Sequence, residues 1–120
     1  MNTRPLEWAQ NYVDLSNAHD LDRIRTLFTT EAIYYSAYFG EFKGRDAIHA
    51  MMVEFFGRFP DAHWAVPEYR DLANNGVEFS FIMTGIDRTS GKMVCRHGLE
   101  RIFFSSDGLI QRIMVLKPDS

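Results

Sequence analysis

Two of the charged residues in a mostly apolar stretch near the end of the sequence are the first candidates for chemistry. Arg96 and Glu100 lie in MVCRHGLERIFFSSDGLIQRIMVL, which spans residues 93–116. Burial disfavours the charged form of a carboxyl group and therefore raises its pKa. A neutral Glu100 could donate a hydrogen bond to an oxygen on which negative charge develops. A direct ion pair with Arg96 would instead keep Glu100 ionised and make both groups structural. The sequence leaves both alternatives open.

The pairing of the strands around Glu100 indicates which residues share its face. If Asp107-Gly108 closes a four-residue loop, Glu100 faces Ile113, and a loop at residues 88–91 places it beside Phe79. Side chains alternate between the two faces of a strand. The face of Glu100 is then mostly apolar and is expected to line a pocket, with Phe79, Phe81, Met83, Arg96, Ile102, Phe104, Leu109, Ile113 and Val115. The opposite, outer face carries Ile82, Thr84, His97, Leu99, Phe103, Ile110, Met114 and Leu116. Because that face is also apolar, it predicts a homodimer.

Three polar residues outside this hairpin are candidates for the same pocket. Tyr12 lies on a predicted helix and could donate a hydrogen bond to an oxyanion beside Glu100. The alternative is a tyrosine whose ring simply packs in the core. Tyr34 and Ser36 alternate on a predicted strand, so both would line the cavity. An ordinary packing role for the ring of Tyr34 is the alternative there.

The histidines and the single cysteine supply the remaining reactive groups. His63 could act as a general base, because the unperturbed pKa of histidine lies near neutral pH. Its face depends on how the Asn75-Gly76 loop closes, and a structural role is the alternative. Cys95 is expected to be a small buried residue. The histidines and Cys95 show no metal-ligand spacing and no Gly-rich phosphate loop is present, so neither a metal nor a cofactor is expected.

Three helices followed by strands would position these residues. Apolar spacing predicts helices near residues 5–16, 20–28 and 44–59, and Asp20 suits the N-cap of the second. Alternation and turn signals predict strands at residues 32–38, 63–72, 77–87, 93–104 and 109–116. Helices first and an antiparallel meander afterwards indicate an α+β fold.

The longest predicted strand indicates that the sheet is bent. Its residues would span roughly 40 Å if straight, which is too long for a flat sheet in so small a domain. Gly85 and Gly98 lie inside the two longest strands, where glycine often marks a bend. We therefore expect residues 1–120 to form one cone-shaped domain. A strongly curved, mostly antiparallel sheet and the three helices of the N-terminal half would enclose a pocket.

Composition argues against several classes of partner. The net charge of −3 is unfavourable for a nucleic-acid surface. A single cysteine cannot form an internal disulfide, which suits a reducing compartment. The first residues, MNTRPLEWAQ, lack the apolar run of a signal peptide, and no segment approaches the roughly 20 apolar residues of a membrane span. We expect a cytoplasmic protein that binds neither nucleic acid nor membranes.

Five segments together resemble the nuclear transport factor 2-like superfamily. They are YVDLSNAHDLDRIRTLF, the strand after it, the helix start GRDAI, the tripeptide FPD and the hairpin ERIFFSSDGLIQRI. Within this superfamily the chain looks most like SnoaL-like and ketosteroid-isomerase-like proteins, over nearly its whole length. The resemblance implies the cone fold without specifying an activity, because the fold hosts isomerases, dehydratases, cyclases, epoxide hydrolases and non-enzymes.

The resemblance implies roles for some residues and leaves one role unfilled. Tyr12 matches a first-helix tyrosine that faces the pocket of ketosteroid isomerases, and Glu100 matches their protonated aspartate. Their general-base aspartate falls at Ser36, which cannot serve as that base. His63 is similar in placement to the catalytic histidine of scytalone dehydratases.

Residues and resemblance together predict a small-molecule enzyme that needs no cofactor. An isomerase, dehydratase or cyclase acting on a small, apolar, oxygenated molecule is expected, with Tyr12, Glu100 and His63 as catalytic residues. The alternative is a non-catalytic module that binds a hydrophobic ligand or mediates dimerisation.

Overall fold

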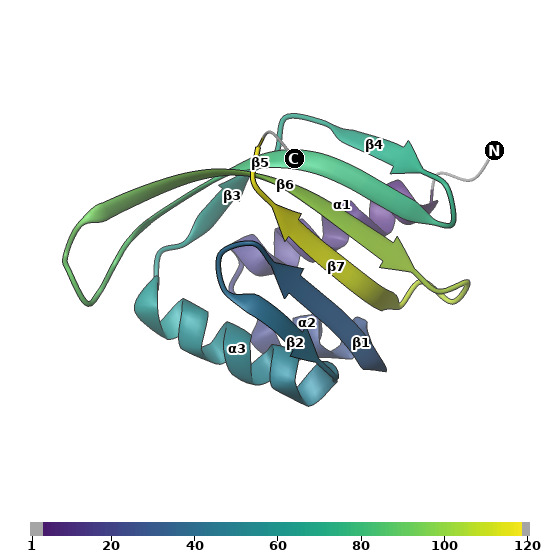
Figure 1. Ribbon diagram of the computed structural model, residues 1–120, viewed down its shortest axis with the longest axis horizontal. Helices are drawn as coiled ribbons and strands as arrows, with labels where there is room; N and C mark the ends of the chain where they lie inside the picture. Colours follow the sequence, from purple (N-terminus) through teal and green to yellow (C-terminus); the bar gives the residue numbers. More distant parts are fainter. Residues whose placement is uncertain (1–3, 119–120) are drawn as a thin grey trace.

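Three helices lie against a curved sheet in the computed structural model, which describes residues 4–118 (Figure 1). They are α1 (Arg4–Asn17), α2 (Leu21–Thr26) and α3 (Arg45–Arg58). Helix α1 buries one face, where Ala9, Tyr12, Val13 and Ser16 recur at the three- and four-residue spacing of a helix. Helix α2 begins after Asp20, whose side chain accepts a hydrogen bond from the backbone N–H of Arg23, as its N-cap prediction requires.

Seven strands form one sheet that remains open at its edges. They are β1 (Phe28–Ser36), β2 (Gly40–Lys43), β3 (His63–Ala65), β4 (Tyr69–Leu72), β5 (Gly76–Ile86), β6 (Met93–Phe104) and β7 (Ile110–Leu116). Their order is β2-β1-β7-β6-β5-β3, and β4 also pairs with β5. Every pair is antiparallel except β1 with β7. Figure 1 shows the long β5 and β6 strands arching over α1. The predicted α+β class and the strongly curved, mostly antiparallel sheet are therefore confirmed.

The structure corrects several predicted element boundaries. The strand predicted at residues 32–38 is β1, which begins earlier and ends at Ser36. Phe28, which the apolar spacing assigned to the second helix, is the first residue of β1 and pairs with Ile110. The carbonyl of Leu27 already accepts a hydrogen bond from the N–H of Ile110, so β7 holds the chain extended where the helix would have continued. The predicted strand at residues 63–72 is two strands, β3 and β4, which flank Pro67. A proline lacks the N–H that a continuous ladder needs.

The strand register around Glu100 was predicted correctly on one side only. Phe79 pairs with Glu100 in the β5–β6 ladder, as expected. Across β7, Glu100 pairs with Val115 instead of Ile113. The ladder begins one residue later than predicted, with Phe104 opposite Ile110, and the irregularity between Phe103 and Phe104 shifts it by one residue more. The shift is two residues, so Glu100 keeps its predicted face. The same irregularity exchanges the faces of the residues that begin β7.

At the start of β7, the predicted inner and outer residues are reversed. Ile110 was assigned to the outer face and is fully buried, whereas Leu109 was assigned to the inner face and is exposed. A bulge inserts an unpaired residue and so changes which side chains point inward. The error is confined to the hairpin end of the strand.

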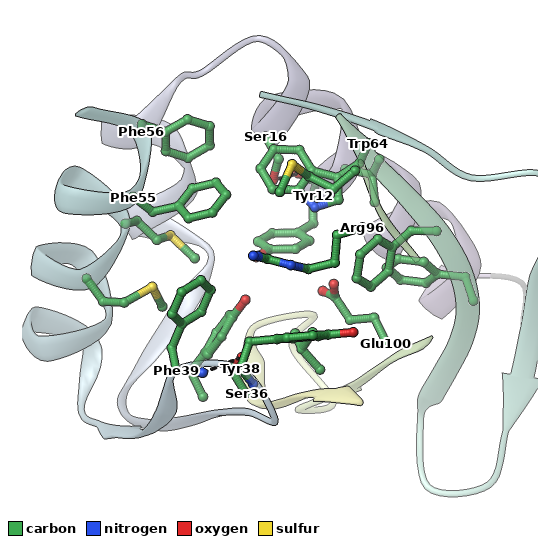
Figure 2. Close-up of a pocket in the computed structure, with 18 residues that line it drawn as sticks. Tyr12, Ser16, Ser36, Tyr38, Phe39, Phe55, Phe56, Trp64, Arg96 and Glu100 are labelled. Atoms are coloured by element: carbon green, nitrogen blue, oxygen red, sulfur yellow. Dashed lines mark hydrogen bonds between the residues drawn. The ribbon is translucent and has the colours of Figure 1, made fainter. Parts of the chain in front are cut away.

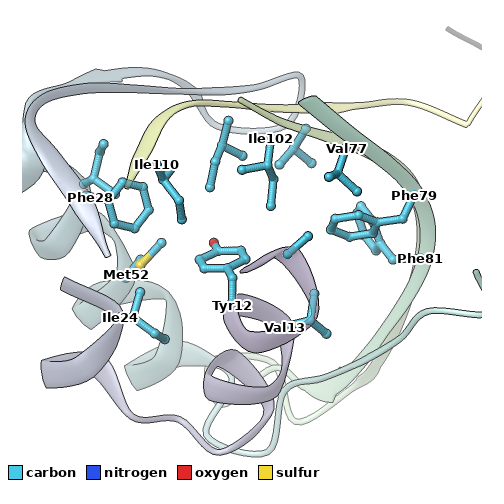
Figure 3. Close-up of a cluster of buried hydrophobic side chains, with 14 of the residues drawn as sticks. Tyr12, Val13, Ile24, Phe28, Met52, Val77, Phe79, Phe81, Ile102 and Ile110 are labelled. Atoms are coloured by element: carbon cyan, nitrogen blue, oxygen red, sulfur yellow. The ribbon is translucent and has the colours of Figure 1, made fainter. Parts of the chain in front are cut away.

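The main core lies between the concave face of the sheet and the helices (Figure 3). Tyr12 and Val13 of α1 point toward apolar side chains of β5, β6 and β7. Phe28, Phe79 and Ile102 are almost completely buried. Burial of one such side chain contributes roughly 1.5–3 kcal/mol to folding. The core therefore fixes α1 against the strand that carries Glu100.

Candidate functional site

A pocket lies inside the curve of the sheet, between α1, α3 and the turn that follows β1. Figure 2 shows Arg96 extending across it, with Phe55 and Phe56 of α3 on one side and Glu100 on the other. Aromatic rings and methionines provide most of its wall. The lining consists of Tyr12, Val13, Ser16, Tyr34, Ser36, Tyr38, Phe39, Met51, Met52, Phe55, Phe56, Trp64, Phe79, Phe81, Met83, Arg96, Glu100 and Val115.

Glu100 is a buried carboxyl group without a compensating charge. Glu100 is only 5% exposed, and its Oε2 atom has no hydrogen-bond partner among residues 4–118. Burial raises the pKa of Glu100 from 4.5 to about 8. The group is therefore mostly neutral at pH 7, and a neutral carboxyl group can donate a hydrogen bond.

Tyr12 and Tyr34 add two hydroxyl groups to the same region. Burial raises the pKa of Tyr12, and the proximity of Tyr34 and Glu100 raises it further. Burial also raises the pKa of Tyr34, again with a smaller effect from Glu100. Both hydroxyls consequently stay protonated across the physiological range. The mutual electrostatic influence of these three groups shows that the fold brings them together.

Arg96 lies in the pocket without pairing with Glu100. Its guanidinium carbon stands 4.7 Å from the ring centre of Tyr38 and 5.4 Å from that of Phe39. Arg96 makes no ion pair among residues 4–118. The strand between Arg96 and Glu100 spans about 13 Å at the usual rise per residue. The geometry thus selects the buried neutral acid over the buried ion pair.

Gly98 leaves space for the Phe81 ring between Arg96 and Glu100. Gly98 lies midway between these two residues on the same face of β6, and its partner across the ladder is Phe81. A Cβ atom added at Gly98 would lie 2.3 Å from Cζ of the Phe81 ring. The ring therefore occupies the space that a side chain at position 98 would fill. It separates the environment of Glu100 from that of Arg96.

Ser36, which stands where ketosteroid isomerases carry a general base, has a structural role. The residue is 2% exposed, and its Oγ atom accepts hydrogen bonds from the backbone N–H groups of Tyr38 at 3.0 Å and Phe39 at 3.2 Å. Such side-chain acceptors stabilise turns. The hydroxyl of Tyr38 in turn donates to the carbonyl of His97 at 3.0 Å. Ser36 and His97 thus fix the two rings on which Arg96 lies.

Two residues predicted for the site lie elsewhere. His63 is exposed on β3, and the neighbouring Trp64 points into the pocket instead, because side chains alternate along a strand. Ile113 is fully buried in the core opposite Ile102 and does not line the pocket. Cys95, predicted to be buried, is exposed on the outer face. The proposed base is therefore absent from the site.

The turn after β1, α3 and Trp64 form a part of the pocket that the alternation of strand residues did not predict. On α3, the ring centres of Phe55 and Phe56 lie 5.7 Å from that of Trp64. Asn17 holds Trp64 in place through two hydrogen bonds, one to each backbone group of that residue. Alternation within the tripeptide HWA was the available signal for the inward side chain.

The described residues offer one kind of chemistry in this pocket. Its lining includes the neutral donors Tyr12, Tyr34 and Glu100, and among residues 4–118 its one cation is Arg96. Within residues 4–118, the lining includes no histidine, no aspartate and no second glutamate. Nor do these residues contain a group of three His, Cys, Asp or Glu side chains that could hold a metal ion. The arrangement can polarise a carbonyl oxygen and stabilise negative charge on it.

The three helices were compared with the length and apolar character that a membrane-spanning helix needs. No helix among the described residues is sufficiently long and apolar to cross a membrane.

Comparisons with known proteins agree with this architecture. A putative SnoaL-like polyketide cyclase from a Jannaschia species is 18% identical, with a TM-score of 0.83, over 95% of this chain and 85% of that one. The epoxide hydrolase/cyclase-like enzyme SalBIII, described in pyran ring formation in the polyether salinomycin, is 14% identical, with a TM-score of 0.86, over 95% of this chain and 90% of that one. A putative isomerase from Bacillus subtilis is 18% identical, with a TM-score of 0.82, over 96% of this chain and 88% of that one.

Identities this low establish the fold alone. No curated protein matches the chain. The model of the SnoaL-like domain, however, matches residues 9–113, which is most of the sequence. This chain therefore belongs to the SnoaL-like domain family.

Proposed function

We propose that this protein is a cofactor-independent enzyme of the isomerase or cyclase type, in which Glu100 acts as a neutral acid. The observation that carries the proposal is the buried carboxyl of Glu100, with its unpartnered Oε2 atom inside an aromatic pocket. An unpaired buried acid is costly to folding, so its retention suggests a task for it. Similar folds described as cyclase-like or isomerase proteins support the class.

In this proposal, the carbonyl oxygen of the substrate accepts hydrogen bonds from Glu100 and from the hydroxyl of Tyr12 or Tyr34. When a proton leaves the carbon next to the carbonyl, negative charge moves onto that oxygen. These donors stabilise the charge more strongly in the pocket than water would. In a β,γ-unsaturated carbonyl compound, water in the pocket takes this proton and returns it to the γ carbon. The carbon–carbon double bond then moves into conjugation with the carbonyl, so the net reaction is an isomerisation with no proton consumed.

A binding protein without turnover is the second candidate. The absence of histidine, aspartate and a second glutamate from the described pocket lining favours it. A pocket of this composition would hold an oxygenated ligand through the same donors. The two candidates differ only in whether a bound carbonyl compound reacts faster.

Deuterium exchange at the carbons next to the carbonyl of 2-tetralone, followed by proton NMR in D2O, distinguishes the two candidates. We expect the protein to accelerate exchange above the buffer rate, with the acceleration constant below pH 8 and falling above it as Glu100 ionises. Glu100→Ala should reduce the acceleration roughly 100-fold, as loss of one oxyanion donor does. Glu100→Gln keeps a neutral donor and should retain about a tenth of the activity, without the decline near pH 8.

The matched control is Glu78→Gln. Glu78 lies on β5, where its carboxylate bonds Arg70 and Arg101 outside the pocket. This variant should keep the wild-type exchange rate. If Glu100→Ala accelerates exchange as much as the wild-type protein, the proposal is overturned. It is also overturned if the wild-type acceleration increases above pH 8 and that of Glu100→Gln does not, because ionised Glu100 would then be the active form. Binding of 2-tetralone without any acceleration would establish the second candidate.

A further inference from the structure

We propose that the pocket takes an aromatic or apolar molecule that carries a carboxylate, and that Arg96 binds this carboxylate. The inference deepens the proposed function and rests on it for one point, the position of the reacting oxygen at Glu100. Anion binding at Arg96 follows from separate observations. It adds an acidic group to the apolar, oxygenated molecule that the sequence predicts.

The first observation is that Arg96 has no ionic partner. It is the single cation of the described pocket lining, and none of the ion pairs among residues 4–118 includes it. By contrast, Arg101 on the same strand bonds Glu78 at 2.7 Å. With Glu100 neutral, the lining carries a net positive charge at pH 7. A charge held in such a low-polarity site favours an anionic ligand.

The second observation is that the guanidinium is already positioned. The rings of Tyr38 and Phe39 contact it through cation–π interactions, which leave the N–H groups at its edge available. Ser36 fixes the backbone of both ring residues, and the bond from Tyr38 to the carbonyl of His97 fixes one ring. A planar guanidinium held in this way matches the two oxygens of a carboxylate.

The third observation concerns the space between the two polar ends. Arg96 and Glu100 are separated by the Phe81 ring over Gly98, and the remaining walls include the rings of Phe55 and Trp64. A ligand that reaches both ends must therefore have an apolar, preferably flat, body. A carboxylate at one end and a carbonyl oxygen at the other complete the match.

Binding of trans-cinnamate and trans-cinnamamide at pH 6.5 tests the inference. It is measured by the change in tryptophan fluorescence, to which Trp64 in the pocket contributes. The two probes have the same shape and differ in charge. We expect the wild-type protein to bind cinnamate at least tenfold more tightly, as hydrogen bonds to a charged group imply. Arg96→Met should abolish this preference while its affinity for cinnamamide stays within about twofold. Equal wild-type affinities, or a preserved preference in Arg96→Met, would overturn the inference.

Two further variants make the result unambiguous. Arg101→Met removes a cation from the same strand outside the pocket and should keep the preference for cinnamate. If Arg96→Met binds neither probe, Arg96→Lys decides: a partial preference supports the inference, and its loss refutes it. If the protein prefers cinnamate but does not accelerate exchange of 2-tetralone, the proposed reaction is refuted and the proposed ligand class is retained.

Discussion

Replacement of Glu100 by glutamine should change how the stability of the protein depends on pH. In the folded state the pKa of Glu100 is about 8, compared with its ordinary value of 4.5. Between these two pH values the folded protein keeps a proton that the unfolded chain releases. The free energy of unfolding must therefore fall as pH rises from 4.5 to 8, and the contribution of Glu100 is constant outside this window. Glutamine does not titrate, so the variant lacks this slope.

The magnitude follows from the size of the pKa change. Each unit corresponds to about 1.4 kcal/mol, so the full window amounts to about 5 kcal/mol. This value is an upper limit, because water entering the pocket or movement of the side chain would lower the cost of ionising Glu100. Even half of it is a large share of the 5–15 kcal/mol that is typical of a folded domain.

Urea unfolding of both proteins at half-unit steps from pH 4.5 to 9 measures the effect. We expect the wild-type protein to lose about 2–5 kcal/mol relative to Glu100→Gln across this range, with most of the change complete by pH 8. Glu78→Gln serves as the control, since Arg70 and Arg101 lower the pKa of Glu78 where burial raises that of Glu100. This variant should keep the decline of the wild-type protein toward pH 8. A stability difference between wild type and Glu100→Gln that is independent of pH would refute the assignment of a buried neutral acid.

Three other predictions concern separate parts of the structure. Gly98→Ala should destabilise the protein by about 1–3 kcal/mol, because the new Cβ atom meets the Phe81 ring, and the additional change Phe81→Leu should recover part of the loss in urea unfolding. Asp87 accepts two hydrogen bonds from Arg58, which lower the pKa of Asp87 to about 2. Wild-type stability should therefore decrease as pH falls from 4 toward 2, more steeply than that of Asp87→Asn in an acid titration followed by circular dichroism. We also propose that the outer face of the sheet forms a homodimer, and sedimentation of a monomer at micromolar concentration would contradict this.

Local signals predicted the fold well where they determined the strand pairing. The turn between β5 and β6 set the pairing of Phe79 with Glu100, and side-chain alternation then placed Arg96 and Glu100 on one face. The same reasoning failed across β7, because the residue pattern marks neither the true length of the loop nor the irregularity near Phe104. It also failed at Phe28, whose apolar character suits either a helix stripe or a buried strand. Tertiary pairing with Ile110 decided the outcome there.

The site was predictable on the strands and less so elsewhere. Alternation located Glu100 and its neighbours, whereas Tyr38 and Phe39 enter the pocket from a turn whose path depends on Ser36. His63 was misplaced because its face depends on pairing with β5, which residue types alone do not determine. Side chains that reach a site from turns and short strands can be assigned to it only from the three-dimensional structure.

The relation between Arg96 and Glu100 depends on a residue with no side chain. Opposite charges on one face of a strand suggest a pair, and burial of both would strengthen that expectation. Gly98 prevents this outcome by admitting the Phe81 ring between them, while the rings after β1 attract the guanidinium to the other side. Burial then raises the pKa of Glu100, with no cation nearby among residues 4–118 to offset the effect. The acid for the proposed chemistry and the cation for the proposed ligand therefore arise from one structural cause.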